Sequence, residues 1–318
     1  MKYLILFLIS FPLFAARQNV IHGNDDRYEW DSYVDKSVQD LGKSVGLIVN
    51  RHRLYLDPET DTYKYGGPTL KRKMRLCPEV RFSEQKVIGR CTGFLVAPNL
   101  LLTAGHCFDQ SDLEASCLHT SVVFDYFKSG QDFEKETVFR CKKIIKTHVS
   151  ESKNYVMDYA LIELDRNTHR DPLVLTKRED RVPLYTPLVM IGYPLGLPQK
   201  IADGAVVKGF NEKEWKNPLQ STIKRKYYFH TNLDAFSGNS GSPIFNEETK
   251  EVEGILIQGD DFDFIMNEER WCQEDHRKPN SGLVSEEMAL RVNEIRAIHG
   301  LIAKYGTTQQ THEQSKSE

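Results

Sequence analysis

Ser240 is the residue of this chain best placed to act as a nucleophile. It lies in the segment GNSGSP between Asn239 and Gly241, and apolar and aromatic runs flank this segment on both sides. A tight, glycine-flanked turn presents a serine hydroxyl clear of its neighbours. It also points successive backbone N–H groups, here those of Gly238 and Ser240, toward one spot that suits an oxyanion. The segment predicts a nucleophile turn with an oxyanion hole, against the alternative of an ordinary Gly-Ser turn in a β protein.

A serine hydroxyl becomes a strong nucleophile only when a base takes its proton and a third group orients that base. His106 lies in the segment TAGHC, directly after the apolar run from Asn99 to Leu102. Asp158 begins the segment DYALIEL, which has the pattern of a strand with a carboxylate at its start. A stray histidine in a capped turn and a solvated strand end are the simpler alternatives. Because all three motifs are present, the chain predicts a His106, Asp158 and Ser240 triad.

Together these motifs resemble those of chymotrypsin-fold, trypsin-like serine endopeptidases, in the variant used by bacterial glutamyl endopeptidases and their relatives. The order His106, Asp158, Ser240 along the chain is the chymotrypsin order. The resemblance implies an all-β fold of two six-stranded antiparallel β-barrels of chymotrypsin type, with a C-terminal helix. It also implies an acyl-enzyme mechanism in which Ser240 attacks the peptide carbonyl, His106 moves the proton and Asp158 holds the imidazole tautomer. The triad would then lie in the cleft between the barrels.

The same resemblance implies a primary specificity pocket that includes Asp234 and Gly259. Asp234 lies six residues before Ser240, where trypsin-like enzymes have the residue at the base of the pocket, so it predicts cleavage after Arg or Lys. Asp234 as a turn-stabilising backbone acceptor is the alternative. Glutamyl-type specificity is a further alternative, although those relatives have a histidine on the pocket strand, where this chain has Leu256 and Ile257. A non-catalytic binding relative would be expected to have lost a triad member.

The six cysteines are expected to be bridged in an oxidising compartment. Fifteen pairings exist in principle. The resemblance favours Cys91 with Cys107, a bridge that would fix the loop carrying His106. Of the others, Cys117 and Cys141 bracket a hairpin-like segment, which leaves Cys77 with Cys272. No two cysteines have zinc-ligand spacing with a histidine nearby, so no metal is predicted.

The N-terminus has the charged, apolar and small-residue parts of a secretory signal peptide, expected over residues 1–16. Residues 17–43 are expected to form either a very short propeptide followed by the mature start, which VIHGNDDR resembles, or a plain exposed arm. Alternating apolar segments then predict a first barrel over residues 44–166 and a second over residues 167–284. Apolar residues at helical spacing predict a helix over residues 285–306. Residues 307–318 have no apolar anchor and are expected to be disordered.

Composition excludes several classes of function. The net charge is −3 and no basic stripe is present, which argues against a nucleic-acid-binding protein. No stretch after the N-terminal one is apolar enough to anchor the chain in a membrane. The sequence therefore predicts a secreted or periplasmic serine-type endopeptidase. It is expected to be a monomer without a cofactor that acts on protein or peptide substrates, with no nucleic-acid or membrane partner. The acidic run Asp260, Asp261 and Asp263 is expected to be a solvated loop, with calcium binding as the alternative.

Overall fold

A computed structural model describes residues 21–152, 155–210, 227–259, 263–278 and 287–314. Six antiparallel strands close the first barrel in the order β10-β11-β7-β6-β3-β8. Their bounds are β3 Val45–Asn50, β6 Gly89–Ala97, β7 Leu100–Thr103, β8 Thr120–Val123, β10 Val138–Ser152 and β11 Tyr155–Leu164. Most positions of β3, β6, β7 and β8 are buried, as expected where a curled sheet encloses its own core.

A second closed barrel follows in the chain. The strand order β12-β15-β16-β20-β14-β13 closes through the pairing of β12 with β13, and β2 adds to the outer edge of β13. The bounds are β2 Arg27–Glu29, β12 Pro187–Gly192, β13 Lys200–Gly209, β14 Tyr228–Thr231, β15 Pro243–Asn246, β16 Val252–Gln258 and β20 Glu287–Arg291. The predicted fold of two six-stranded antiparallel barrels is thus confirmed.

One hydrophobic cluster spans the two barrels, and buried hydrogen bonds also join them. The main cluster of buried apolar residues includes Leu47 and Phe94 of the first barrel and Ile191 and Leu290 of the second. The hydroxyl of Tyr193, a fully buried residue, donates to the carbonyl oxygen of Val45 at 3.0 Å. A buried polar group is costly unless it is paired, so such bonds fix how the barrels sit against one another.

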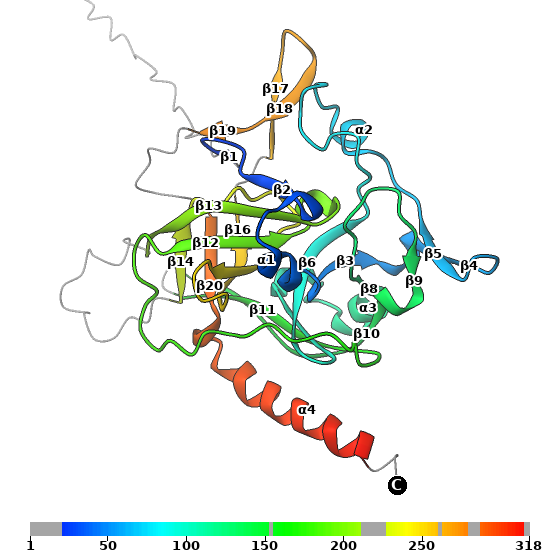
Figure 1. The fold of residues 1–318 in the computed structure, drawn as a ribbon, viewed down its shortest axis with the longest axis vertical. Coiled ribbons are helices and arrows are strands. Elements are labelled where there is room, and N and C mark those ends of the chain that lie inside the picture. The colour runs from blue at the N-terminus through cyan, green and yellow to red at the C-terminus, as the bar shows by residue number, and fades with distance from the viewer. Residues whose placement is uncertain (1–20, 153–154, 211–226, 260–262, 279–286, 315–318) are drawn as a thin grey trace, which may run out of the picture.

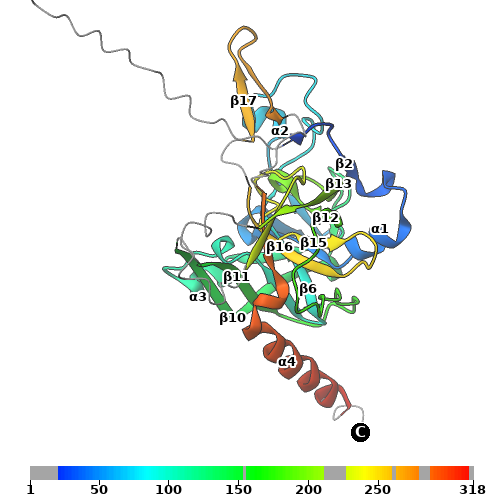
Figure 2. The same cartoon turned by 90° about the vertical axis from the view of Figure 1, so that its left-hand side faces the viewer.

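Insertions extend from the barrels. A three-stranded sheet comprises β4 Leu54–Asp57, β5 Thr62–Tyr65 and β9 Phe133–Glu134. A hairpin of β17 Phe264–Asn267 and β18 Cys272–Asp275 stands out from the body beside α2, Leu70–Met74, in both ribbon views (Figures 1 and 2). The Cys77–Cys272 disulfide joins this hairpin to the chain after α2. A parallel pair, β1 Ile21–His22 with β19 Arg277–Lys278, places the start of the described chain nearby.

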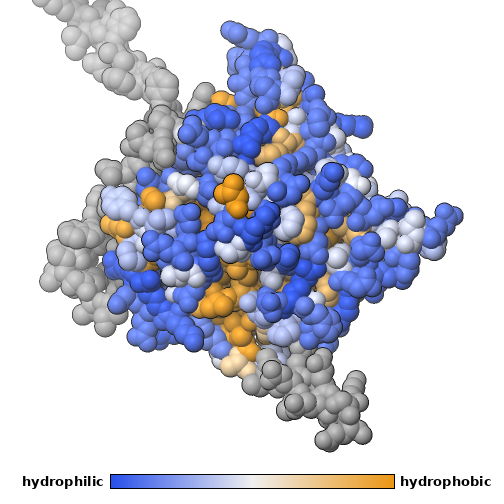
Figure 3. Space-filling model, viewed as in Figure 1, coloured by the Kyte–Doolittle hydropathy of each residue, from blue (hydrophilic) through white to orange (hydrophobic). Residues whose placement is uncertain are grey.

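Within the residues that the structure describes, helices are few and mostly short. They are α1 Lys36–Gly42, α2, α3 Leu113–Leu118 and α4 Arg296–Gln314, with 3-10 turns η1 Trp30–Ser32, η2 Arg51–Arg53, η3 Gly105–Cys107, η4 Lys135–Thr137, η5 Pro194–Gly196 and η8 Val292–Glu294. Among the described residues, no helix has the length and apolar character needed to cross a membrane. The face viewed in Figure 3 is mostly hydrophilic, with apolar surface concentrated in a central strip above the point where α4 leaves the body.

The C-terminal prediction needs correction in three places. Residues 287–291 form strand β20 rather than helix, and the second barrel therefore extends beyond residue 284. The C-terminal helix begins at Arg296 and continues to Gln314, through most of the segment expected to be disordered. The reason for the first two differences is that β20 pairs with both β14 and β16. As a strand, this segment pairs with the backbone N–H and C=O groups of β14 and β16. Those groups would be left unpaired if the segment were a surface helix.

Candidate active site

His106 lies in η3, immediately after the fully buried strand β7. Gly105 leaves no room for a side chain, because a Cβ there would lie 2.7 Å from Cγ2 of Val149 and 2.9 Å from the carbonyl oxygen of Tyr159. The Cys91–Cys107 disulfide ties the residue after His106 to β6, with the two Cα atoms 6.1 Å apart. The histidine turn, residues Thr103–Cys107, is thus held on both sides of His106, whose side chain is 41% exposed.

Asp158 on β11 contacts His106 in two ways. Its Oδ2 lies 2.5 Å from Nδ1 of His106, and its Oδ1 accepts the backbone N–H of His106 at 2.9 Å. The Asp158 side chain is only 13% exposed, so little water competes for its oxygens. A carboxylate beside Nδ1 favours the tautomer with the proton on that nitrogen, which leaves Nε2 as the basic atom.

Ser240 occupies a turn that only glycine neighbours permit. Gly238 has φ +94° and Gly241 has φ +87°, a region that L side chains rarely adopt. A Cβ on Gly241 would lie 2.2 Å from Oγ1 of Thr103, so the nucleophile turn, residues Gly238–Ser242, packs directly on the histidine turn. The structure therefore brings together the two turns that sequence motifs singled out.

Thr92 on β6 forms hydrogen bonds with the nucleophile turn. Its side chain is fully buried, and Oγ1 donates to the carbonyl oxygen of Gly238 at 2.9 Å while accepting the N–H of Tyr193 at 3.0 Å. Its backbone N–H donates to the carbonyl oxygen of Ser240 at 2.9 Å. Among the described residues, the N–H groups of Gly238 and Ser240 donate to no protein acceptor. Both amides of the predicted oxyanion hole are therefore available to a ligand.

Asp234 does not present its carboxylate to an empty pocket. It is 3% exposed, and its two oxygens accept the backbone N–H groups of His22 and Asp26, each at 2.8 Å. Burial raises the pKa of this carboxyl from 3.8 to about 7, because charge is disfavoured away from water. The structure thus corrects the prediction of a pocket-base residue. Asp234 is a backbone acceptor that anchors the N-terminal arm, defined as Ile21–Glu29.

Arg27 completes the attachment of this arm. It is buried, pairs with Asp25 at 2.7 Å, and lies with Cζ 4.1 Å from the ring centroid of Phe236, two residues after Asp234. The arm is therefore packed against the loop that leads to the nucleophile turn. Of the acidic run after β16, Asp263 accepts the N–H of Ser237 at 2.8 Å. Asp260 and Asp261 lie outside the described residues, as does the expected signal peptide.

Gly259, the other predicted pocket residue, lies at the end of β16 and is partly exposed. A Cβ at this position would lie 2.6 Å from Oε2 of Glu287. Glu287 is the first residue of β20 and is completely buried. Glu287 was not predicted because its segment also fits a helical pattern, and Thr92 was not predicted because a buried strand threonine follows no motif.

The three disulfides pair the cysteines as predicted: Cys91–Cys107, Cys117–Cys141 and Cys77–Cys272. Two groups of potential metal ligands occur among the described residues, and each contains disulfide-bonded cysteines. A sulfur atom in a disulfide cannot act as a thiolate ligand, so neither group makes a metal site as it stands.

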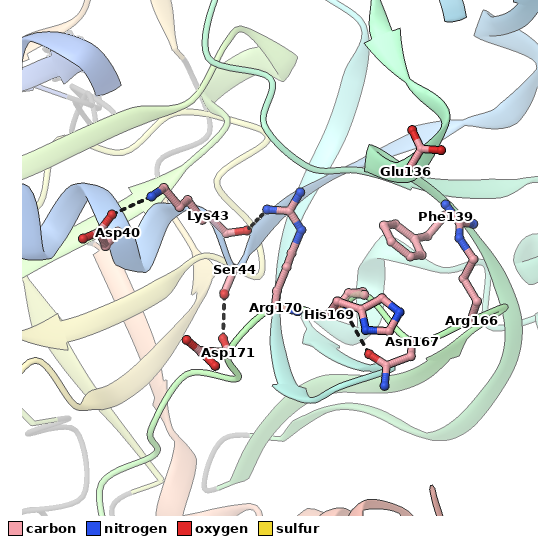
Figure 4. A pocket seen from close by; sticks show the side chains of 11 residues that line it. Asp40, Lys43, Ser44, Glu136, Phe139, Arg166, Asn167, His169, Arg170 and Asp171 are labelled. Atoms are coloured by element: carbon pink, nitrogen blue, oxygen red, sulfur yellow. Dashed lines mark hydrogen bonds and ion pairs between the residues drawn. The ribbon is translucent and has the colours of Figure 1, made fainter. Parts of the chain in front are cut away.

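A separate cavity of about 1130 Å³ is lined mainly by residues 166–171, and no residue of the proposed triad lines it (Figure 4). Arg170 in its wall donates to the carbonyl oxygen of Lys43 at 2.7 Å and forms an ion pair with Asp125 at 2.5 Å. Because these bonds connect the segment after the first barrel to the start of that barrel, the charged groups here serve the packing of the fold.

Two closed antiparallel barrels with the histidine and serine turns in contact define a chymotrypsin-type fold. The model of the trypsin-like peptidase domain matches residues 91–255, just over half of the 318 residues. The chain belongs to this trypsin-like peptidase family.

The individual relatives are distant. A glutamyl endopeptidase of Bacillus licheniformis is 23% identical over 168 residues, which cover 51% of this chain and 47% of that protein. The chain thus spans about half the length of this curated relative. Among solved structures, the Vibrio cholerae VesB protease has a TM-score of 0.49 at 17% identity, with 88% of this chain and 66% of that chain covered. An inactive form of Rv3671c from Mycobacterium tuberculosis has a TM-score of 0.43 at 16% identity, with 86% and 91% covered.

Proposed function

We propose that this protein is a serine endopeptidase that uses Ser240, His106 and Asp158. The observation that carries the proposal is the double contact of Asp158 with His106, next to a turn whose Gly238 and Ser240 amides make no protein hydrogen bond among the described residues. A paired imidazole, a neighbouring serine and two available donors are the parts that acyl transfer requires.

Each part has a role in the proposed reaction. Nε2 of His106 takes the proton of Ser240 as its Oγ attacks the peptide carbonyl, and the imidazolium that forms is stabilised by Asp158. The carbonyl oxygen, now negatively charged, accepts the N–H groups of Gly238 and Ser240. His106 then gives its proton to the leaving amine, and water hydrolyses the acyl-enzyme by the same steps.

Two alternatives are less well supported. A non-catalytic binding protein has no need for a histidine held by a carboxylate at 2.5 Å, a contact that orients a base. Glutamyl-type specificity has in its favour the distant relative of that name. However, the strand where such enzymes resemble one another in a histidine has the buried Leu256 and Ile257 here.

We also propose export to the cell surroundings or the periplasm. Three disulfides are typical of proteins that fold in an oxidising compartment, and the N-terminal residues have the pattern of a signal peptide. The proposed substrates are proteins or peptides, cleaved by a monomer that needs no cofactor.

The test compares two serines of the same loop. Ser240→Ala is expected to abolish labelling by a fluorophosphonate probe and to lower kcat on a digested proteome by about 10⁶-fold. Ser237→Ala is the matched control, because Ser237 is exposed three residues earlier, and this variant is expected to keep its labelling. Undiminished turnover by Ser240→Ala would end the proposal.

A further inference from the structure

Arg90 is an exposed arginine on β6, close to the proposed catalytic residues. It directly precedes Cys91, whose disulfide holds the histidine turn. It also lies two residues before Thr92, whose backbone N–H donates to the carbonyl oxygen of Ser240 at 2.9 Å. The pairing of β6 with β3 shifts by one residue at Arg90, which makes it the extra residue of a β-bulge. A bulge changes the direction of a side chain and is common beside active sites.

The Arg90 side chain extends toward the start of β8, where a second arginine lies close by. Its Nη2 donates to Oγ1 of Thr120 at 3.2 Å. Thr120 pairs with Asn50 at the end of β3, and Arg51 is the next residue of the chain (Figure 1). Nη1 of Arg51 donates to the carbonyl oxygen of Leu118 at 3.2 Å. The two arginines are thus attached to neighbouring ends of β3 and β8.

The described part of the chain does not neutralise these two cations. Their side-chain hydrogen bonds go to the neutral oxygens of Thr120 and Leu118, and no described carboxylate forms an ion pair with either guanidinium. Partial burial lowers the pKa of Arg90 from its usual value, because a charged group is disfavoured where water is excluded. A cation in such surroundings attracts an anion more strongly than a fully hydrated one.

The histidine turn decides which part of a substrate Arg90 faces. In the proposed reaction His106 gives its proton to the leaving amine, so the part of the substrate after the scissile bond lies on the side of this turn. The Cys91–Cys107 disulfide joins the residue after Arg90 to the residue after His106. Arg90 therefore lies beside the leaving half of the substrate.

We infer that Arg90, supported by Arg51, binds an acidic side chain among the first residues after the scissile bond. This inference rests on the proposed function and names its substrate class: proteins or peptides with Asp or Glu on the leaving side. A carboxylate fits the planar fork of a guanidinium, and the charge-assisted hydrogen bonds that form are stronger than neutral ones.

The test uses purified protein and peptides that share the residues before the scissile bond. They carry Asp, Asn, Ala or Lys at each of the first three positions after it, and the shared half comes from a sequence that the wild type cleaves in a digested proteome. Arg90→Gln and Arg51→Gln each remove one charge, whereas Arg90→Lys keeps it. Arg296→Gln is the matched control, because Arg296 is an exposed arginine at the start of α4.

The wild type is expected to cleave Asp peptides with a kcat/KM about 10-fold above that of the Asn peptides at one or more of these positions. Arg90→Gln should lower this ratio to about 2-fold or less, and Arg51→Gln should lower it in part. Arg90→Lys and Arg296→Gln should retain it, and added salt should weaken it in the wild type. Labelling by the fluorophosphonate probe, which carries no peptide on the leaving side, should change less than about 3-fold in each variant.

Equal cleavage of Asp and Asn peptides by a wild type that is labelled would overturn the inference alone. An unchanged ratio in Arg90→Gln, or an equal loss of the ratio in Arg296→Gln, would also overturn it. Loss of labelling in both Arg90→Gln and Arg90→Lys would count against it too, because the residue would then support the fold of the site. A wild type that neither labels nor cleaves any peptide would overturn the proposed function, and this inference with it.

Discussion

The buried carboxyl of Asp234 makes the stability of the fold depend on pH in an unusual direction. Its pKa is raised from 3.8 to about 7 by burial, so between these values the folded chain binds a proton that the unfolded chain has released. Raising the pH therefore favours the unfolded state over this range. At about 1.4 kcal/mol per pH unit, the difference between 3.8 and about 7 lowers the free energy of unfolding by about 4 kcal/mol at pH 8 relative to pH 4.

Asp234→Asn removes this titration and keeps the size of the side chain. Relative to its parent, the variant is expected to become steadily more stable as the pH rises from 5 to 8, because its amide stays neutral throughout. The loss of one acceptor for the N–H groups of His22 and Asp26 costs roughly 1–3 kcal/mol, but that cost does not vary with pH. The predicted quantity is thus the slope, against pH, of the difference in free energy of unfolding between the variant and its parent. A cost that does not vary with pH leaves this slope unchanged.

Urea unfolding followed by tryptophan fluorescence at half-unit steps of pH measures this slope. All proteins carry Ser240→Ala, so that self-digestion does not interfere. Asp35→Asn is the control: Ser37 and Lys250 hold the pKa of Asp35 below its usual range, so Asp35 stays ionised in both states above pH 5 and the effect of its loss should not vary. A difference between Asp234→Asn and its parent that is constant from pH 5 to 8 would refute the reasoning.

Three further predictions concern the site and its supports. Asp158→Asn is expected to lower kcat by about 10⁴-fold while the fold survives, since the geometry remains and the His106 tautomer is wrong; a loss under 10-fold in peptide assays would contradict the proposed role. Thr92→Val leaves the Gly238 carbonyl and the Tyr193 N–H without a partner, at about 1–3 kcal/mol for each group. The Thr92→Val variant should lower both the urea midpoint of unfolding and kcat. An unchanged midpoint would argue against the supporting role of Thr92. Replacing Cys91 and Cys107 together by Ala opens a bridge of sequence separation 16 and should cost about 3 kcal/mol. The Cys117 and Cys141 pair, of separation 24, should cost a similar amount with less effect on kcat, and recovery of free thiols from purified, unreduced wild-type protein would contradict both.

The strands of both barrels were predictable because their patterns are local. β7 and β16 are each an apolar segment between turn residues, and the two lie within the ranges 44–166 and 167–284 predicted for the first and second barrels. β20 was missed since the apolar residues around it also fit a helical period, while the partners that make it a strand come from β14 and β16. Strands that are far apart in the sequence can pair without any signal in the local sequence of either strand.

The candidate site divides in the same way. The segments around His106, Asp158 and Ser240 are contiguous motifs, so the residue types alone suggested the chemistry. The position of Asp234 was misjudged because its partners His22 and Asp26 lie 212 and 208 residues away in the sequence. Its spacing from Ser240 is fixed by the loop, but the direction of its carboxylate is decided by the arm that packs over it.

The Cys77–Cys272 bridge has a consequence for the integrity of the enzyme. It closes a covalent ring between positions 195 residues apart, and that ring contains all three proposed catalytic residues and the connection between the barrels. A single cut by the enzyme itself or by another protease, anywhere from residue 78 to residue 271, therefore yields two fragments that stay attached. Such a nicked molecule would run as one species on a gel without reductant and separate only after reduction. If the backbone were cleaved within this ring, the proposed catalytic residues would therefore remain covalently connected through the disulfide.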